Sequence, residues 1–178
     1  PKCVVNGNRY YSLQQMIVDG QYKSFMEVHA VGEEKPVVLE LDFASWELTD
    51  GVIWSFDVIT EGERKGYVFA VGIDWTDMAD GSRYPGASYL VYVDEEGKFV
   101  SKEKSTPKQG EVTYQEVFVD DEGYVYLLEN DGHSVRVLDE KGNYIYVSKP
   151  WQQVMSVTEE EVLGHHVLEF VPDSHAME

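Results

Sequence analysis

The sequence contains a single cysteine, Cys3, so no disulfide can form within the chain. Zinc sites that rely on several cysteines are excluded for the same reason. Apart from Lys2, no neighbouring residue in the sequence would lower the pKa of the Cys3 thiol, which argues against a catalytic nucleophile. The simplest interpretation is a small apolar residue in an N-terminal strand.

Basic residues are scarce. The chain has 14 Lys and Arg against 33 Asp and Glu, which gives a formal net charge of -19 and a pI near 4.5. An acidic excess of this size repels nucleic-acid phosphates and anionic lipids, so direct nucleic-acid binding and membrane-surface binding are excluded as functions. If the protein has a protein partner, we expect that partner to be basic.

Long hydrophobic runs are also missing, and none approaches the roughly 18 residues that a membrane-spanning helix requires. The first five residues, Pro1 to Val5, lack the apolar stretch of a secretory signal. Together with the single cysteine, these absences favour a soluble, cytoplasmic protein.

The sequence is nevertheless rich in core-forming residues, since it is 178 residues long, 43% hydrophobic and 13% aromatic. This composition excludes a disordered acidic tail. A chain of this length buries roughly 70% of its unfolded surface in one domain. We therefore predict one folded domain over residues 1–178.

Apolar and polar residues alternate along most of the chain, and turn residues separate the alternating segments. In one such segment Val37, Leu39 and Leu41 share a face, while Glu40 and Asp42 take the other. We predict an all-β fold, an antiparallel meander of about a dozen strands with propeller-like blades. A closed β-barrel or a sandwich of the same hairpins is the alternative.

This fold divides along the sequence into four parts. We expect N-terminal hairpins in residues 1–50, repeated units in 52–101 and 112–147, and C-terminal strands in 150–178. One short helix is expected near the N-terminus, where Ser12 can cap residues 13–18 and Gly20 can end them.

An internal repeat is the most specific signal. The turn Asp94-Glu95-Glu96-Gly97 aligns with Asp139-Glu140-Lys141-Gly142 at an offset of 45 residues, and Gly66 aligns with Gly123 at an offset of 57. The difference of 12 residues is explained by an insertion between Asp74 and Gly86. A period near 45 is typical of a four-stranded propeller blade.

The second copy, Phe118 to Asn130 followed by Val135 to Ile145, resembles a blade of an NHL-type β-propeller. In that pattern an acidic turn with glycine leads into an aromatic and aliphatic strand, and a second such turn follows. Residues 112–147 match best and residues 52–101 match loosely. The resemblance implies propeller blades, but NHL-type proteins serve both as binding platforms and as enzyme scaffolds, so no activity follows from it.

The length of the chain departs from that family, because 178 residues are too few for its usual number of blades. Closure would need about four blades or assembly between chains, and the third possibility is an open array.

The insertion is the segment in which we expect a binding site. Long connections within compact domains are often functional, and aromatic residues with arginine commonly anchor interfaces. The candidate binding residues are Asp74, Trp75, Asp77, Asp80, Arg83 and Tyr84. The non-functional alternative is a solvated loop whose two aromatic residues cover the core.

Metal and cofactor sites are not expected. The spacing of Asp74, Asp77 and Asp80 differs from that of a calcium-binding EF-hand. His165 and His166 would point to opposite faces of a strand, which prevents them from holding one ion together. The motifs of serine hydrolases, phosphate-binding loops and zinc proteases are also missing, which makes a catalytic function less favoured.

Acidic residues gather in three clusters, at 94–96, 120–122 and 159–161. The third follows Thr158, so it either caps a helical turn or connects strands. If such turns share one end of the fold, they form a negative patch that imitates a phosphate array. The simpler alternative is an acidic surface that only keeps the protein soluble.

These observations favour a non-catalytic binding module, including an inhibitor, that docks its acidic surface and the 74–86 segment on a basic protein. One alternative is a binder or hydrolase of small ligands or carbohydrates with a pocket at one end of the fold. Another is a structural subunit that completes its sheet by self-assembly.

Overall fold

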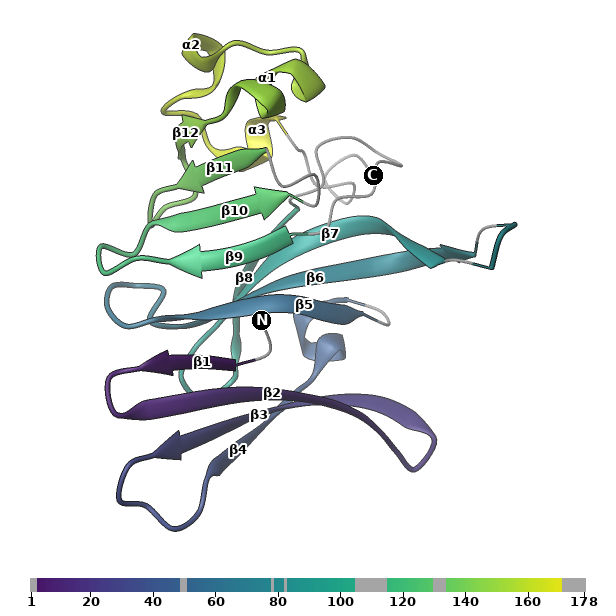
Figure 1. Ribbon diagram of the computed structural model, residues 1–178, viewed down its shortest axis with the longest axis vertical. Coiled ribbons are helices and arrows are strands. Elements are labelled where there is room, and N and C mark those ends of the chain that lie inside the picture. The colour runs from purple at the N-terminus through teal and green to yellow at the C-terminus, as the bar shows by residue number, and fades with distance from the viewer. Residues whose placement is uncertain are drawn as a thin grey trace.

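The computed structural model describes residues 3–48, 51–77, 79–81, 83–104, 115–129 and 134–170, with the backbone alone at 74–77, 83–86, 115 and 129. Its strands form three four-stranded antiparallel sheets, and strands that neighbour one another in a sheet follow one another along the chain (Figure 1). The predicted all-β meander is confirmed. The closed-barrel alternative is wrong, because the described strands fall into three separate sheets.

Each sheet takes up one continuous part of the sequence. The first sheet contains β1 (Cys3–Asn6), β2 (Arg9–Val18), β3 (Gln21–Ala30) and β4 (Val37–Leu41). The middle sheet contains β5 (Val52–Ile59), β6 (Gly66–Asp77), β7 (Arg83–Val93) and β8 (Phe99–Lys104). The third sheet contains β9 (Gln115–Val119), β10 (Val125–Glu129), β11 (Val135–Leu138) and β12 (Tyr144–Val147). The predicted units 52–101 and 112–147 therefore correspond to the middle and third sheets, although residues 112–114 lie outside the described part.

The first strands of the three sheets lie next to one another. β1 contacts β5, and β5 contacts β9. The Val117 N–H of β9 donates a hydrogen bond to Ser55 Oγ (3.2 Å), and the Val119 N–H donates one to Asp57 Oδ2 (2.7 Å). Together the three strands line a groove of about 430 Å³. Sheets that pack face to face with their first strands innermost have the arrangement of propeller blades, here as an array of three.

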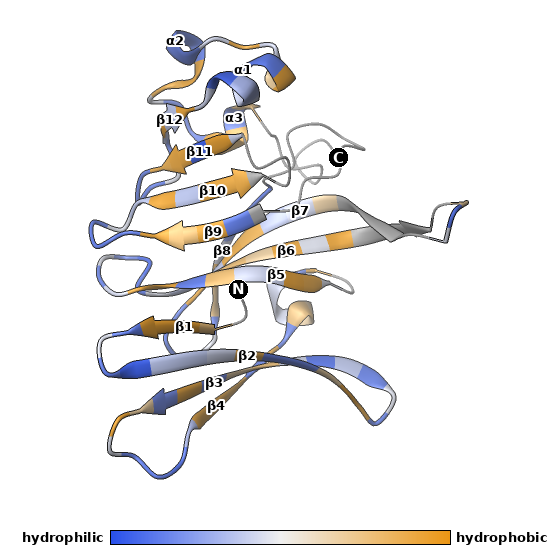
Figure 2. Ribbon diagram, in the orientation of Figure 1, coloured by the Kyte–Doolittle hydropathy of each residue, from blue (hydrophilic) through white to orange (hydrophobic). Residues whose placement is uncertain are grey.

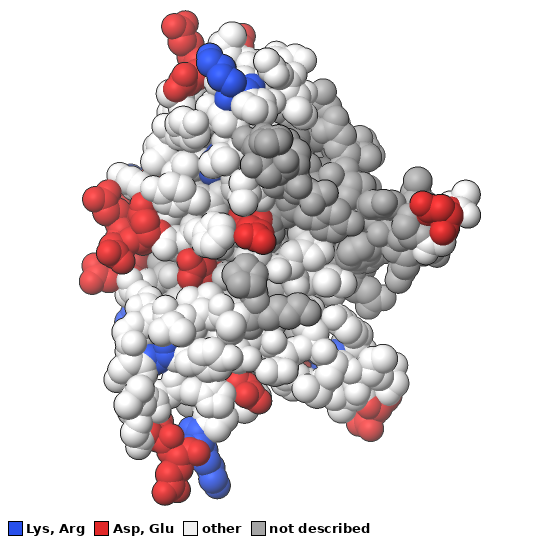
Figure 3. All heavy atoms as spheres, viewed as in Figure 1, with Lys and Arg blue, Asp and Glu red and all other residues white. Residues whose placement is uncertain are grey.

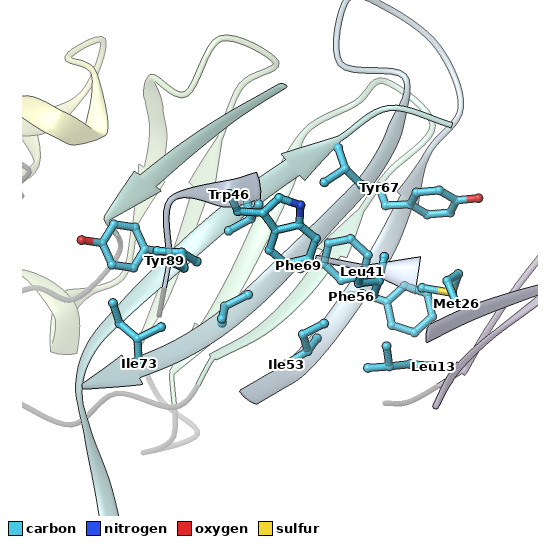
Figure 4. Packing of buried hydrophobic residues seen from close by; sticks show 14 of the residues in the cluster. Leu13, Met26, Leu41, Trp46, Ile53, Phe56, Tyr67, Phe69, Ile73 and Tyr89 are labelled. Atoms are coloured by element: carbon cyan, nitrogen blue, oxygen red, sulfur yellow. The ribbon is translucent and has the colours of Figure 1, made fainter. Parts of the chain in front are cut away.

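The middle sheet is buried on both faces. Toward the first sheet, Tyr67, Phe69 and Val71 join a core with Met26 and Leu41 (Figure 4). Toward the third sheet, a second core forms from Val68, Ala70, Leu90, Tyr92 and their partners. A strand covered on both sides reads as a continuous apolar run, as β6 and β7 do. Figure 2 shows the consequence, with hydrophobic residues along the strands and hydrophilic residues in the turns.

Short helical segments pack beside the sheets. The 3-10 helix η1 (Phe43–Trp46) contacts β8 and places Trp46 in the first core, where its ring stacks on Phe69 with the ring centroids 5.5 Å apart. In the second core Trp151 packs on Tyr144 with a centroid separation of 5.4 Å. Trp151 belongs to α1, the first of three short helices: α1 (Lys149–Met155), α2 (Glu159–Val162) and α3 (Val167–Phe170). No described helix has the length and apolar character to cross a membrane.

The prediction of C-terminal strands in 150–178 is wrong for residues 150–170, which form these helices, while 171–178 lie outside the described part. The physical reasons are local. Pro150 lies in the first turn of α1, where backbone N–H groups have no acceptor within the helix, so the lack of an N–H in proline costs no hydrogen bond. Thr158 and Glu161 form a complete capping box at the start of α2, so the third acidic cluster is a helical turn. His165 and His166 directly precede α3 instead of lying in a strand.

The short helix expected after Ser12 is also wrong. Residues 9–18 form the strand β2, which pairs with β3 along its whole length, including Leu13 with Met26. Asp19 and Gly20 form the tight turn between them, both with positive φ (52° and 76°). Pairing with β3 and burial of Leu13 outweigh the weak helical signal of this segment.

Candidate functional site

Three turns of the chain share one hydrogen-bond pattern. In each, the Oδ1 atom of an aspartate accepts hydrogen bonds from the backbone N–H groups two and four residues later. The N···O distances are 3.0 and 2.8 Å at Asp94, 2.9 and 3.0 Å at Asp120, and 2.9 and 2.9 Å at Asp139. The predicted equivalence of Asp94 and Asp139 is therefore confirmed, and Asp120 adds a third copy.

Each of these turns closes on a glycine in the left-handed region, with φ between 84° and 87°. The glycine N–H donates to the carbonyl oxygen of the aspartate at 3.0 Å in all three copies. At Asp139, partial burial acts to raise the pKa of the carboxyl. The hydrogen bonds from Asn143 and Lys141 outweigh that effect, and they lower the pKa below its ordinary value. These backbone hydrogen bonds fix the shape of the turns.

The three turns lie at the same end of the molecule as the β5–β6 turn. We call the four turns 60–65, 94–98, 120–124 and 139–143 the acidic turn end. Lys65 Nζ lies 3.2 Å from Glu95 Oε1, which places two of these turns side by side. Together they contain ten acidic and four basic residues. Figure 3 shows a large group of acidic side chains at the corresponding edge of the molecule, on the left of the view.

A cavity of about 530 Å³ opens between three of the turns, 60–65, 120–124 and 139–143. Six carboxylates line it, those of Glu61, Glu63, Asp120, Asp121, Glu122 and Glu140. Tyr92 and Arg64 also line it, and the Arg64 guanidinium carbon lies 4.1 Å from the centre of the Tyr92 ring. Tyr92 itself is fully buried.

The positive charge of Arg64 is already neutralised from inside the protein. Its Nη2 atom lies 2.8 Å from Oε1 of Glu103, a β8 residue that is only 4% exposed. Burial acts to lower the pKa of Arg64, but Tyr92 and Glu103 outweigh it and raise the pKa, so the guanidinium stays charged. The nearby His166 Nε2 lies 3.6 Å from the same Glu103 oxygen. Because Glu103 balances Arg64, the cavity rim keeps its negative character.

Acidic side chains therefore outnumber the two basic ones, Arg64 and Lys141, around this cavity. Within the described ranges, no three His, Cys, Asp or Glu side chains are placed to hold a metal ion. Burial is the main cause that raises the pKa of Asp57, a candidate base. Its two carboxylate oxygens accept hydrogen bonds from Val58 and Val119, so this side chain joins β5 to β9. Its role is therefore structural.

The residues predicted as the binding site lie at the other end of the middle sheet. Asp74, Trp75 and Asp77 belong to β6, while Arg83 and Tyr84 belong to β7. The expected loop is wrong, because the two strands remain paired up to Asp77 and Arg83 and form an arm that projects from the sheet (Figure 1).

Among the six predicted site residues, only Asp80 has a described side chain, and it is exposed in the turn at the tip of the arm. The side chains of the other five lie outside the described part. Since β6 runs from the acidic turn end to the arm, the fold does not bring the arm together with the acidic turns. The arm and the acidic turn end are separate surfaces.

Sequence reasoning missed the Arg64–Glu103 pair and the cavity above it. The two residues are 39 positions apart, and Arg64 stands between Glu63 and Lys65 in a stretch typical of an exposed turn. The sequence of β8, FVSKEK, does not alternate between apolar and polar residues, so nothing local marked Glu103 as buried. Comparisons with models of protein families, with curated proteins and with solved structures found no match.

Proposed function

We propose that this protein is a non-catalytic binding module that docks its acidic turn end on a basic protein, with inhibition of that partner as one consequence. The observation that carries the proposal is the acidic cavity between three turns of fixed shape. A cavity of about 530 Å³ is large enough for a lysine or arginine side chain. The surrounding carboxylates supply the complementary charge.

The acidic turn end is pre-organised for this task. Oδ1 of Asp94, Asp120 and Asp139 is held by backbone N–H groups, so the turns need no reordering when a partner arrives. The residues that follow, among them Asp121, Glu122 and Glu140, are exposed and point their charges to solvent. Such groups steer a basic partner and raise its rate of association.

The alternative of a carbohydrate binder or hydrolase has less support at this cavity. Carbohydrate sites use exposed aromatic rings as platforms, whereas Tyr92 is fully buried and its ring is covered by Arg64. Burial is the largest cause that raises the pKa of Tyr92, so its hydroxyl stays neutral and is unsuited to serve as a base.

The proposal predicts that reversing two charges beside the cavity weakens binding of a short polylysine peptide. In Asp121→Lys/Glu122→Lys the peptide should bind about tenfold more weakly than to the wild type, because close charge pairs are lost. The dissociation constant is measured by calorimetry at low salt and at about 0.5 M salt, where screening should weaken wild-type binding strongly.

The matched control is Glu159→Lys/Glu160→Lys, which changes the net charge equally on exposed residues of α2. Because α2 does not line the cavity, this variant should bind polylysine almost as well as the wild type. Equal weakening by both variants would show that diffuse charge alone attracts the peptide, and it would contradict a site at the acidic turn end.

A further inference from the structure

Two sheet faces have no neighbouring sheet in the described part of the chain. The middle sheet is covered by the first sheet on one side and by the third on the other. The opposite face of the third sheet carries Phe118, Tyr126 and Tyr146, which are 43%, 38% and 47% exposed. Phe118 pairs with Tyr126, and Val137 lies between Tyr126 and Tyr146 and pairs with both. We call it the third-sheet outer face.

The first sheet presents a similar surface on the side away from the middle sheet. Val5 pairs with Tyr10, and both point away from the core that buries Tyr11 and Leu13. Val5, Tyr10 and Val38 are 73%, 41% and 54% exposed. We call this surface the first-sheet outer face.

The distribution of exposed hydrophobic side chains singles out the two end sheets. Among the residues of the middle-sheet strands whose side chains are described, Val100 of β8 is the one large hydrophobic residue that is exposed. The strands of the first sheet expose seven, of which four lie on the first-sheet outer face, namely Val5, Tyr10, Met16 and Val38. The strands of the third sheet expose four. Neighbouring exposed hydrophobic side chains on one face of a sheet are typical of a surface that a partner covers.

Charge on these faces decides what can cover them. On the first-sheet outer face Lys23 pairs with Glu40 (3.2 Å), and His29 lies 3.1 Å from Glu27. On the third-sheet outer face Glu116 is the one charged residue with a described side chain within the strands. A basic partner therefore has little to recognise there. Two copies of a chain with a net charge of -19 repel each other elsewhere, and these faces are where that repulsion is weakest.

We propose that the third-sheet outer face of one copy packs on the first-sheet outer face of a second copy. This contact repeats the relation that already joins the first sheet to the middle sheet and the middle sheet to the third. It is heterologous, so two reciprocal contacts close a ring of two chains when the rotation fits. Such a ring contains six sheets. The proposal rests on the outer faces alone and is independent of the function assigned to the acidic turn end.

The test is the mass of the protein in solution, measured by light scattering after size exclusion over a wide range of concentration. We expect a dimer or a larger assembly for the wild type. Val38→Lys on the first-sheet outer face and Phe118→Lys on the third-sheet outer face should each weaken association by at least about tenfold, since each buries a charge in the contact.

The matched control is Val100→Lys, which places the same new charge on an exposed valine of the middle sheet, where 46% of the side chain is accessible. This variant should associate as the wild type does. Near-ultraviolet circular dichroism verifies that each variant is folded, and the two faces provide independent variants if one of them is not. Val38→Lys should still bind polylysine, which separates this proposal from that of the acidic turn end.

A wild-type protein that remains monomeric at every concentration would overturn the proposal and would leave the outer faces to another partner or to further sheets. Association that Val38→Lys, Phe118→Lys and Val100→Lys leave unchanged would also overturn it, because the copies would then meet through a different surface.

Discussion

Arg64 and Glu103 carry opposite charges into the interior, between the middle sheet and the acidic turn end. Glu103 is 4% exposed, and one of its oxygens, Oε2, has no hydrogen-bond partner within the described residues. The pair therefore depends on the contact between Arg64 Nη2 and Glu103 Oε1 (2.8 Å). Desolvation of two charges offsets most of their attraction, so such a pair positions groups more than it stabilises the fold.

This balance leads to a prediction about single and double variants. Glu103→Leu should lower the free energy of unfolding by about 2 kcal/mol, because it leaves the Arg64 guanidinium partly buried without its partner. The double variant Arg64→Met/Glu103→Leu should recover most of that loss. Urea unfolding of the wild type, Arg64→Met, Glu103→Leu and the double variant gives the coupling energy. A double variant as unstable as Glu103→Leu alone would contradict this account.

Individual residues were predictable where their interactions are local. Asp94 and Asp139 could be aligned because the bonds that define their turns span four residues. Arg64 and Glu103 could not be paired, because their contact depends on how two turns and two strands are packed. The candidate residues of the arm were chosen for their chemical types, and the sequence held no information on their distance from the acidic turns.

At the level of elements, the glycines of the repeated turns differ in their surroundings. Gly142 has a φ of 87°, and an added Cβ atom would lie 2.7 Å from both Glu103 Oε1 and His166 Nε2. Gly97 has nearly the same φ, 84°, but its added Cβ atom would meet only Leu39 Cβ, at 3.8 Å. The same turn is therefore tightly packed in one copy and open in another.

We expect Gly97→Ala to lower the free energy of unfolding by about 1 kcal/mol, which is the cost of a left-handed conformation for a residue with Cβ. Gly142→Ala should lower it by at least about 1 kcal/mol more, because the methyl group displaces the Glu103 and His166 side chains. Chemical denaturation of both variants measures the difference. Equal losses would mean that these side chains move aside freely.

Strands were easier to predict than helices in this chain. Alternation over several residues identifies a strand that has one face buried, which is the situation of β4. The segment after Ser12 carries a helical capping signal and no clear alternation, and its pairing with β3 is what makes it a strand. Residues 149–170 form helices of four to seven residues, too short for a clear helical period.

On the scale of the whole molecule, the sequence indicated two repeated units, and the structure contains three sheets of the same kind. The first sheet was expected to contain hairpins but was not aligned with the other two, because its turns lack an aspartate followed by glycine three positions later; Asp19 and Gly20, for example, are adjacent. In addition, exposed hydrophobic residues such as Val5 and Tyr10 on its outer face weaken the alternation of apolar and polar residues along its strands. The stacking of sheets depends on contacts between residues such as Ser55 and Val117, 62 positions apart, which no local pattern specifies.

The net charge leads to a prediction about salt. Acids outnumber bases by 33 to 14, so repulsion within the folded protein should exceed the stabilisation from its exposed ion pairs, each worth less than about 1 kcal/mol. Adding sodium chloride up to about 0.5 M should therefore raise the free energy of unfolding, because salt screens the repulsion. Urea titrations at several salt concentrations provide the measurement. A steady fall in stability with salt would show that the ion pairs dominate.

The double coverage of the middle sheet has a consequence for how the protein melts. β6 and β7 supply side chains to both cores, so neither core can come apart while the other keeps its full set of contacts. Detaching either flanking sheet would leave one face of these strands in water, which destabilises what remains. The two hydrophobic cores therefore unfold as one cooperative unit, because disorder in either outer sheet destabilises β6 and β7, which both cores share.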